Sequence, residues 1–161
     1  MTVDGGGAPA TPGEVAEERR GEYEVSTDPA RLDVPAVHAY LTRSYWAEGI
    51  PIETVRRSIA GSLPFGLYAD GVQVGFARVV TDRATFAYLA DVYVLEEHRG
   101  AGLGVWLVDF IMRHPDLQGL RRWSLATRDA HDLYRKFGWT ELKSPDRWME
   151  RHFPDVYAMN P

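Results

Sequence analysis

A glycine-rich segment at residues 99–104, which reads RGAGLG, carries the clearest chemical signal in this chain. A helix N-terminus exposes unpaired N–H groups and about half a positive charge. Glycines let an anion approach that backbone without a Cβ in the way. An apolar β-type run ends at Val94 and a helix-type run begins near Leu103. We therefore interpret the segment as a phosphate-binding loop, with a pyrophosphate as the expected anion.

Two widespread glycine-rich motifs fit this segment less well. A dinucleotide-binding fingerprint needs a third glycine where Val105 stands. A P-loop needs Gly-Lys-Ser or Gly-Lys-Thr after the glycines, and none follows here. Neither nucleotide-binding class is favoured.

The elements before the loop follow from periodicity and turn signals. Alternation predicts a first strand at residues 23–26, and Asp33 followed by Pro35 predicts the start of a helix. A second helix, over residues 52–60, ends at Gly61. Three successive strands then fill residues 65–94, and the Asp70-Gly71 dipeptide predicts a tight hairpin turn between the first two.

The elements after the loop complete the expected fold. Apolar residues at helical spacing predict a deeply packed helix from Leu103 to Ile111. A short strand at 123–125, a helix at 129–137 stopped by Gly138, and a last strand at 139–142 follow. The order β-α-α-β-β-β-α-β-α-β predicts an α/β fold with a mixed, mostly antiparallel, twisted sheet. Residues 1–21 are expected to be a flexible Gly/Ala/Pro-rich tail, and residues 22–161 one domain.

Composition limits the classes of function. The chain has 161 residues, 45% of them hydrophobic, which suits one globular domain. A net charge of -5 argues against nucleic acid as the main partner. No stretch resembles a signal peptide or a membrane span, so we expect a cytoplasmic protein without a membrane partner. The chain has no cysteine, and its five histidines lack metal-ligand spacing, so no metal site is expected.

Three segments together resemble the GNAT superfamily of N-acetyltransferases. The spacing Arg-x-x-Gly-x-Gly at residues 99–104, after a strand and before a helix, resembles the acyl-CoA-binding motif of that family. Residues 89–94, LADVYV, look like its central strand. Residues 129–139 look like its late helix, with Trp139 where the family usually has Phe. The resemblance covers about residues 23–142.

The resemblance implies acetyl-CoA as co-substrate. The central strand would pair its backbone with the pantetheine amides, and the glycine loop would hold the phosphates. Related enzymes often carry Asn where Thr127 stands, which puts that contact in doubt. The implied acetyl-CoA-binding residues are Val92, Tyr93, Val94, Arg99, Gly100, Ala101, Gly102, Leu103, Gly104, Val105, Thr127 and Ala130.

The implied reaction moves an acetyl group to a primary amine of a small molecule or peptide, by direct attack in a ternary complex. The chain offers no Cys nucleophile and no Ser in a nucleophile elbow. The resemblance makes Tyr134 the acid that protonates the departing thiolate. Asp91, an acidic group on an apolar strand, is the candidate base. It could equally hold a loop or bind a cationic substrate.

Tyr45 and Trp46 lie between the first two predicted helices, where the resembling fold borders its acceptor cleft. Core packing or a homodimer interface explains these aromatic residues about equally well. The main rival to an enzyme is a non-catalytic acyl-CoA-binding module, which would need the glycine loop but not Tyr134. A second rival is an oligomerising binding protein without CoA. The presence of Tyr134 in the motif favours the enzyme.

Overall fold

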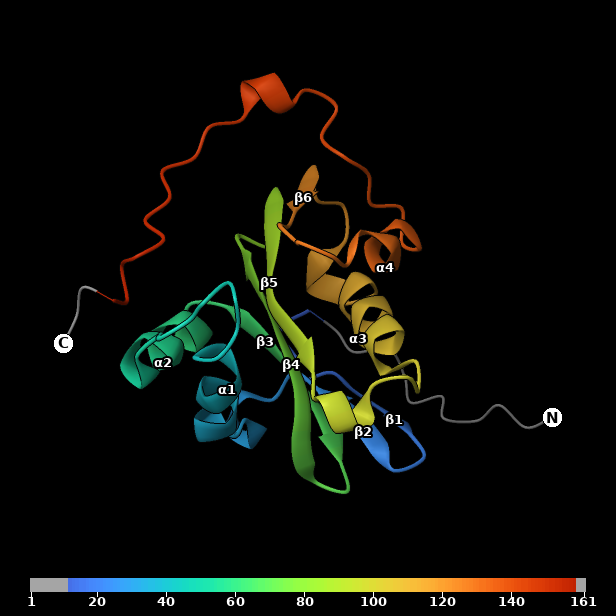
Figure 1. Cartoon of the computed structure of the whole chain (residues 1–161). Coiled ribbons are helices and arrows are strands. Elements are labelled where there is room, and N and C mark those ends of the chain that lie inside the picture. Colours follow the sequence, from blue (N-terminus) through green and yellow to red (C-terminus); the bar gives the residue numbers. More distant parts are fainter. Residues whose placement is uncertain (1–11, 159–161) are drawn as a thin grey trace.

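The computed structural model describes residues 12–158, built around one six-stranded sheet in the order β1-β2-β3-β4-β5-β6 (Figure 1). Neighbouring strands are antiparallel except β5 and β6, which are parallel. Helices α1 and α2 cover one face, and α3 and α4 cover the other. The mixed, mostly antiparallel α/β fold is as predicted. The elements are β1 (Glu17–Arg20), β2 (Tyr23–Ser26), η1 (Pro29–Arg31), α1 (Val34–Leu41), α2 (Ile52–Ala60), β3 (Leu63–Ala69), β4 (Val72–Thr81), β5 (Phe86–Val94), η2 (Glu96–His98), α3 (Leu103–Met112), η3 (Pro115–Leu117), β6 (Arg122–Ser124), α4 (His131–Arg135) and η4 (Pro145–Arg147).

Two local signals in the sequence form as predicted. Asp33 caps α1 by accepting a 3.1 Å hydrogen bond from the Ala36 N–H. Asp70 and Gly71 turn the chain between β3 and β4 with φ angles of 47° and 82°. Two consecutive positive φ angles are those of the hairpin turn whose twist matches the flanking strands.

A β-bulge in β5 connects the two hydrophobic cores. Phe76 pairs with Tyr93 and Arg78 with Ala90, so β5 has one residue more than β4 over this stretch. Before the bulge, Leu89 packs into the core under α3. After it, Tyr93 packs into the other core, with α1 and α2. Because of the extra residue, the odd-numbered side chains of β5 lie on one face of the sheet before the bulge and on the opposite face after it.

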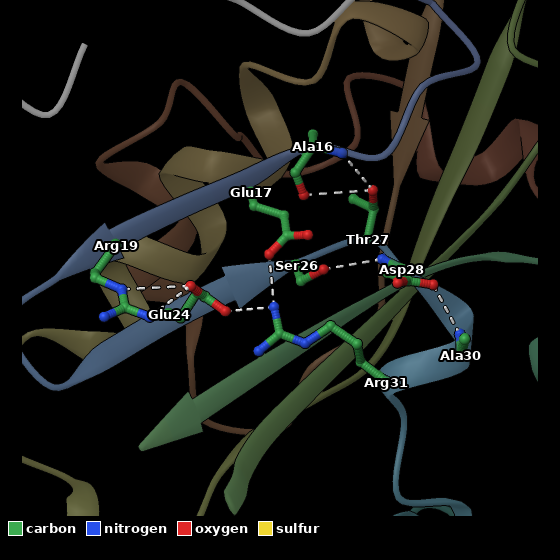
Figure 2. Close-up of polar contacts among 9 residues, drawn as sticks. All are labelled: Ala16, Glu17, Arg19, Glu24, Ser26, Thr27, Asp28, Ala30 and Arg31. Carbon is green, nitrogen blue, oxygen red and sulfur yellow. Dashed lines mark hydrogen bonds and ion pairs between the residues drawn. The ribbon is translucent and has the colours of Figure 1, made fainter. Parts of the chain in front are cut away.

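The N-terminal segment departs from the prediction of a flexible tail over residues 1–21. Residues 1–11 lie outside the described residues, but residues 17–20 form the edge strand β1. Ala16 and Thr27 exchange hydrogen bonds, and Arg31 pairs with both Glu17 and Glu24 (Figure 2). We predicted a tail because the segment is rich in glycine and proline and has little apolar content. In the fold, the charged residues of the segment have partners on neighbouring elements.

Glu18 connects β1 to helix α3 and to the residue that follows it. Its carboxylate accepts hydrogen bonds of 2.7 Å from Trp106 Nε1 and 2.9 Å from Arg113, both in the α3 region. Burial raises the pKa of Glu18, but these hydrogen bonds outweigh that effect and lower it overall. The ordered domain therefore begins before residue 22.

The predicted last strand at residues 139–142 is wrong in this structure, where the segment is neither strand nor helix. The preceding helix is also shorter than expected and ends at Arg135. Gly138, at φ 84°, makes the predicted stop. A strand needs a partner edge, and no strand of the described residues pairs with this segment. The β order therefore gains β1 at its start and loses this strand at its end.

Candidate active site

The glycine loop presents an uncapped helix N-terminus. Gly100 and Gly102 have φ angles of 90° and 75°, and Gly102 occupies the cap position of α3 without a side-chain hydrogen bond. The first hydrogen bond of the helix runs from the Trp106 N–H to the Gly102 carbonyl at 3.0 Å. The N–H groups of the three residues between them precede that bond, and such groups bind anions.

Space for the anion is present over the loop. A Cβ placed on Gly100, Gly102 or Gly104 would meet no atom within 4 Å. Open space above several N–H groups, with the positive end of α3 behind them, fits a diphosphate. The chemistry of the loop thus suits the pyrophosphate of acetyl-CoA.

Arg99 has partners within the fold. Its guanidinium donates to the Val94 carbonyl at 2.9 Å and to the Tyr40 hydroxyl at 3.0 Å. These bonds join the start of the glycine loop to the end of β5 and to α1. Contact between Arg99 and a phosphate stays a prediction.

The edge of β5 that leads to this loop lacks a partner strand over part of its length. Strand β6 pairs with β5 at only three positions, from Phe86 to Tyr88. Beyond Tyr88, the edge of β5 that faces away from β4 has no ladder partner among residues 12–158. Val92 and Val94 lie in this stretch. An unpaired strand edge offers N–H and C=O groups to an extended, amide-containing ligand such as pantetheine.

Asp91 forms the bulge of β5 and is held from two sides. Its φ of 58° is left-handed, a conformation that Asp tolerates better than most residues. Oδ2 accepts a hydrogen bond of 2.6 Å from Arg78 Nε, and Oδ1 accepts one of 2.9 Å from Trp46 Nε1. The Asp91 side chain is only 9% exposed. Each carboxylate oxygen can still accept a further donor.

The connection between α1 and α2 brings Tyr45 and Trp46 to the site. Their rings pack edge to face with centroids 5.0 Å apart. The Tyr45 hydroxyl accepts a hydrogen bond from the Arg128 N–H at 3.1 Å, and the Arg128 guanidinium lies 3.9 Å from the Tyr45 ring centroid. The predicted acceptor-side residues therefore lie between Asp91 and the segment that precedes α4.

Tyr134 is buried near the C-terminal end of α4. Burial, and secondly the nearby Tyr45, raise the pKa of its hydroxyl to about 12. Its ring lies 5.9 Å from that of Trp139. It borders a cavity of about 510 Å³ that Thr127 and Leu125 also line.

Ala130 is the N-cap residue of α4, and Thr127 lies in the segment just before it. Thr127 Oγ1 accepts a hydrogen bond of 3.1 Å from the Ala130 N–H. The Thr127 O–H can still donate to a ligand, whereas the Ala130 N–H is already engaged. A direct ligand contact from Ala130 would use its other atoms.

Sequence reasoning missed two residues of this region. Arg78 pairs with Asp91, and Arg128 packs on Tyr45. Arg78 had a readable signal, because it is the lone charge in an apolar strand and a buried charge needs a partner. Arg128 lies in a polar loop, where no feature of the sequence indicated a contact. No group of three or more metal-ligating side chains gathers within residues 12–158.

Comparison with known proteins identifies the relationship. Residues 61–141 match the family model described as acetyltransferase (GNAT) domain. A curated protein of Gibberella zeae, by its name a candidate acetyltransferase, is 38% identical over 140 residues, covering 73% of this chain and 78% of that protein. A crystal structure from Xanthomonas campestris pv. campestris, titled as a candidate acetyltransferase of the GNAT family, has 52% identity and a TM-score of 0.83. That match covers 86% of this chain and 98% of the other.

A more distant structure shares the fold. It is an acetyltransferase from Clostridium acetobutylicum, assigned by prediction and crystallised with acetyl-CoA. Its TM-score is 0.59 at 15% identity, over 81% of this chain and 94% of that one.

The fold and these relatives define an acyltransferase. The chain belongs to the GNAT acetyltransferase family. The family transfers acetyl groups and uses acetyl-CoA. Across residues 12–158, no helix is both long enough and apolar enough to cross a membrane.

Proposed function

We propose that the protein acetylates a primary amine of a small molecule or peptide, using acetyl-CoA, by direct attack in a ternary complex. The observation that carries the proposal is the convergence of three features: the hydroxyl of the buried residue Tyr134 near Tyr45, the Asp91 bulge, and the open edge of β5. An acyl-CoA-binding module would need only the edge and the glycine loop.

The donor would lie along β5 and end at α3. The backbone of residues 92–94 pairs with the pantetheine amides, and the N–H groups at the start of α3 bind the diphosphate. The open space over the glycines and the unpaired strand edge support this arrangement. The thioester then lies near the bulge, where the Val92 N–H stabilises the developing oxyanion.

The amine must lose a proton to react. An alkylamine of pKa about 10.4 is mostly protonated at pH 7, which costs about 4 to 5 kcal/mol. Asp91 receives the amine proton through a water molecule and passes it to solvent. The support for this role is its fixed, nearly buried carboxylate beside Trp46. Trp46 and Tyr45 form the acceptor side of the site.

In the transfer step, the amine nitrogen attacks the thioester carbon, a C–N bond forms and the C–S bond breaks. The Tyr134 hydroxyl donates its proton to the departing sulfur and regains one from solvent. The hydroxyl is protonated at neutral pH at the ordinary pKa of 10.0 and equally at its raised pKa of about 12, as a proton donor must be. The products are an amide and free CoA thiol.

The direct test is release of free thiol from acetyl-CoA by the full-length protein across a panel of amines, with the amide product identified by mass spectrometry. A thiol reagent gives no background from the protein, because the chain has no cysteine. Amine-dependent thiol release with matching amide supports the proposal. Tight acetyl-CoA binding without turnover on any amine would overturn it in favour of a binding module.

A further inference from the structure

A solvent-exposed part of the sheet continues from the bulge of β5 toward the turn between β4 and β5. Val79 and Leu89 point into the core under α3, so their neighbours Val80 and Tyr88 lie on the opposite face, the one that carries α1 and α2. Val80 and Tyr88 pair across the two strands and are 40% and 37% exposed. In Figure 1, the ends of β4 and β5 that meet at this turn extend beyond α1 and α2. This part of the face is therefore open to solvent.

Large apolar side chains extend this surface in both directions. Phe86, on the same face of β5 as Tyr88, is 36% exposed. On the α1–α2 connection, Tyr45 and Trp46 are 49% and 40% exposed. We call the set Tyr45, Trp46, Val80, Phe86 and Tyr88 the apolar strip. A contiguous apolar surface in solvent marks a place where a protein binds something.

The apolar strip passes the proposed catalytic centre. Trp46 donates its hydrogen bond to Asp91, and Arg78, the other partner of Asp91, lies next to Val80 on this face of β4. The stretch of β5 from Asp91 to Phe86 is roughly 15 Å long, at about 3.3 Å per residue. An acceptor with its amine beside Asp91 can therefore extend an apolar body along the strip.

An arginine lies at the far end of the apolar strip. Arg122 of β6 pairs with Phe86 of β5. Its neighbour Trp123 packs against the core under α3, so the Arg122 side chain lies on the face of the strip. The guanidinium lies over the Trp148 ring, 4.7 Å from its centroid. Among residues 12–158, no carboxylate lies within 4.0 Å of the Arg122 guanidinium.

The charge of Arg122 is available to a ligand. A guanidinium over an aromatic ring keeps the N–H donors at its edge, where a carboxylate can accept two of them side by side. Asp82, in the turn between β4 and β5, does not supply this carboxylate. Its oxygens accept hydrogen bonds from backbone N–H groups of the turn and from the Thr85 hydroxyl. The apolar strip therefore ends at a cation without a bonded counter-charge.

On the basis of the proposed function, we propose that the acceptor is a primary amine with an elongated apolar body and a carboxylate at its far end, such as a long ω-amino acid. The amine lies beside Asp91, as the transfer requires. The body covers Tyr88 and Val80, and the carboxylate accepts two hydrogen bonds from Arg122. Trp148 holds the guanidinium in position.

Arg128 is a second cation on the acceptor side. Its guanidinium lies on the Tyr45 ring and 3.9 Å from a carboxylate oxygen of Asp129. Tyr45 packs against Trp46, so Arg128 lies near the amine end of the apolar strip. It would suit an acceptor whose carboxylate is close to its amine, such as an α-amino acid. Arg122 is favoured because it has no carboxylate partner and because the strip leads to it.

Initial rates of thiol release from acetyl-CoA test the acceptor class. The acceptors are the ω-amino acids aminohexanoate, aminooctanoate and aminododecanoate, each compared with its primary amide, which has the same length without the charge. We expect kcat/KM to favour the acid over the amide at least tenfold for the longest acceptor and hardly at all for the shortest. Equal kcat/KM for acid and amide at every length would overturn the proposal. A preference confined to the shortest acid would also overturn it and would point to Arg128.

These outcomes differ from a failure of the proposed function. If the protein acetylates other amines but not aminododecanoate, the acceptor class is wrong and the transfer reaction stands. If it binds acetyl-CoA and acetylates no amine at all, the proposed function is wrong and the acceptor class with it.

Arg122→Gln should remove the preference for the long acid. We expect kcat/KM for aminododecanoate to fall at least tenfold, while that for its amide and the affinity for acetyl-CoA by calorimetry stay unchanged. Arg121→Gln is the matched control, because it removes the same charge from the adjacent position of the chain, and it should keep the preference. Equal losses in the two variants would indicate long-range attraction alone and would overturn the contact with Arg122.

Val80→Asp tests the position of the apolar body. It should lower kcat/KM for aminododecanoate and for its amide alike, at least tenfold, because a charge replaces part of the apolar strip. Val72→Asp is the control: Val72 is 67% exposed at the other end of β4, and this variant should match the wild type. Both variants change exposed side chains, so both should fold, as circular dichroism can verify. Unchanged rates in folded Val80→Asp protein would overturn the placement of the body.

Discussion

Trp46 Nε1 donates a 2.9 Å hydrogen bond to Oδ1 of Asp91, which joins the α1–α2 connection to the bulge of β5. Asp91 is in turn held by Arg78 of β4. The proposed acceptor side and the strand proposed to bind the donor are therefore connected by one carboxylate. Substitutions at the partners of Asp91 should therefore change KM for the amine and KM for acetyl-CoA differently.

Trp46→Phe should raise KM for the amine about tenfold, since a hydrogen bond to a charged group contributes roughly 1.5 to 3 kcal/mol. The KM for acetyl-CoA should not change, because the glycine loop and the β5 edge are untouched. Initial rates with each substrate varied in turn measure both constants. An equal rise in both would place Trp46 outside the acceptor side.

Asp91→Asn separates a base from a positioning residue. Asn tolerates the left-handed conformation and can still accept from Trp46, but it cannot take up a proton. We expect kcat to fall about 100-fold at neutral pH and to recover toward high pH, where more amine is already neutral. The measurement is the pH–rate profile.

The same variant leaves Arg78 without its charged partner, which should cost about 3 kcal/mol of unfolding free energy in urea. Assays therefore belong at temperatures where circular dichroism shows the variant folded. An unchanged kcat in folded protein would remove Asp91 from proton transfer.

Tyr134→Phe should lower kcat about 100-fold while the ring packing with Trp139 is kept. Tyr68→Phe is a matched control, because Tyr68 is also buried, its pKa is also raised to about 12 by burial, and it lies on β3 outside the site. The control should keep wild-type turnover. Equal rates for all three proteins would contradict the acid role of Tyr134.

Gly104→Ala should separate stability from binding. Position 104 lies in the first turn of α3, where Ala is favoured over Gly by up to about 1 kcal/mol, and the new Cβ meets no protein atom within 4 Å. The unfolding free energy should therefore stay the same or rise. Acetyl-CoA should bind more weakly, which calorimetry measures. Gly61→Ala, at the end of α2, is the control and should bind acetyl-CoA as the wild type does.

Alkaline pH should destabilise the protein through its buried tyrosines. Burial raises the folded-state pKa of Tyr68 and Tyr134 to about 12 from an ordinary value of 10.0, and raises that of Tyr93 as well. The folded state therefore binds more protons, and stability is lost as pH rises from about 10 to 12. Each of the first two tyrosines should cost about 1 kcal/mol at pH 11. Urea unfolding at pH 9 and pH 11 measures the difference, and Tyr68→Phe should reduce it.

Local signals in the sequence predicted most of the fold. The Asp33 cap, the Asp70-Gly71 turn and the Gly138 stop depend on neighbours in the chain, and all formed. The β1 strand was missed because Glu17 pairs with Arg31 and Glu18 with Arg113, partners that only the tertiary fold brings near. The strand at 139–142 failed for a related reason, since strand formation depends on a partner that local pattern does not supply.

The sequence indicated individual residues of the candidate site but not the contacts between their side chains. The sequence indicated Asp91 as an isolated acid, whereas the structure gives it Arg78 and Trp46 as partners. Nothing in the sequence indicated that Arg99 also contacts Val94 and Tyr40, and its contact with a phosphate stays a prediction. Long side chains reach partners across the sheet, so spacing along the chain does not determine their contacts.

The bulge at Asp91 makes β5 unusually sensitive to length. Odd-numbered residues of β5 face α3 before the bulge and face α1 after it, so the alternation of side chains between the two faces is reversed at Asp91. Deleting a single residue there would rotate Tyr93 into the wrong core and Val92 out of its own, although composition would hardly change. Along this strand, an indel is a more severe mutation than almost any replacement.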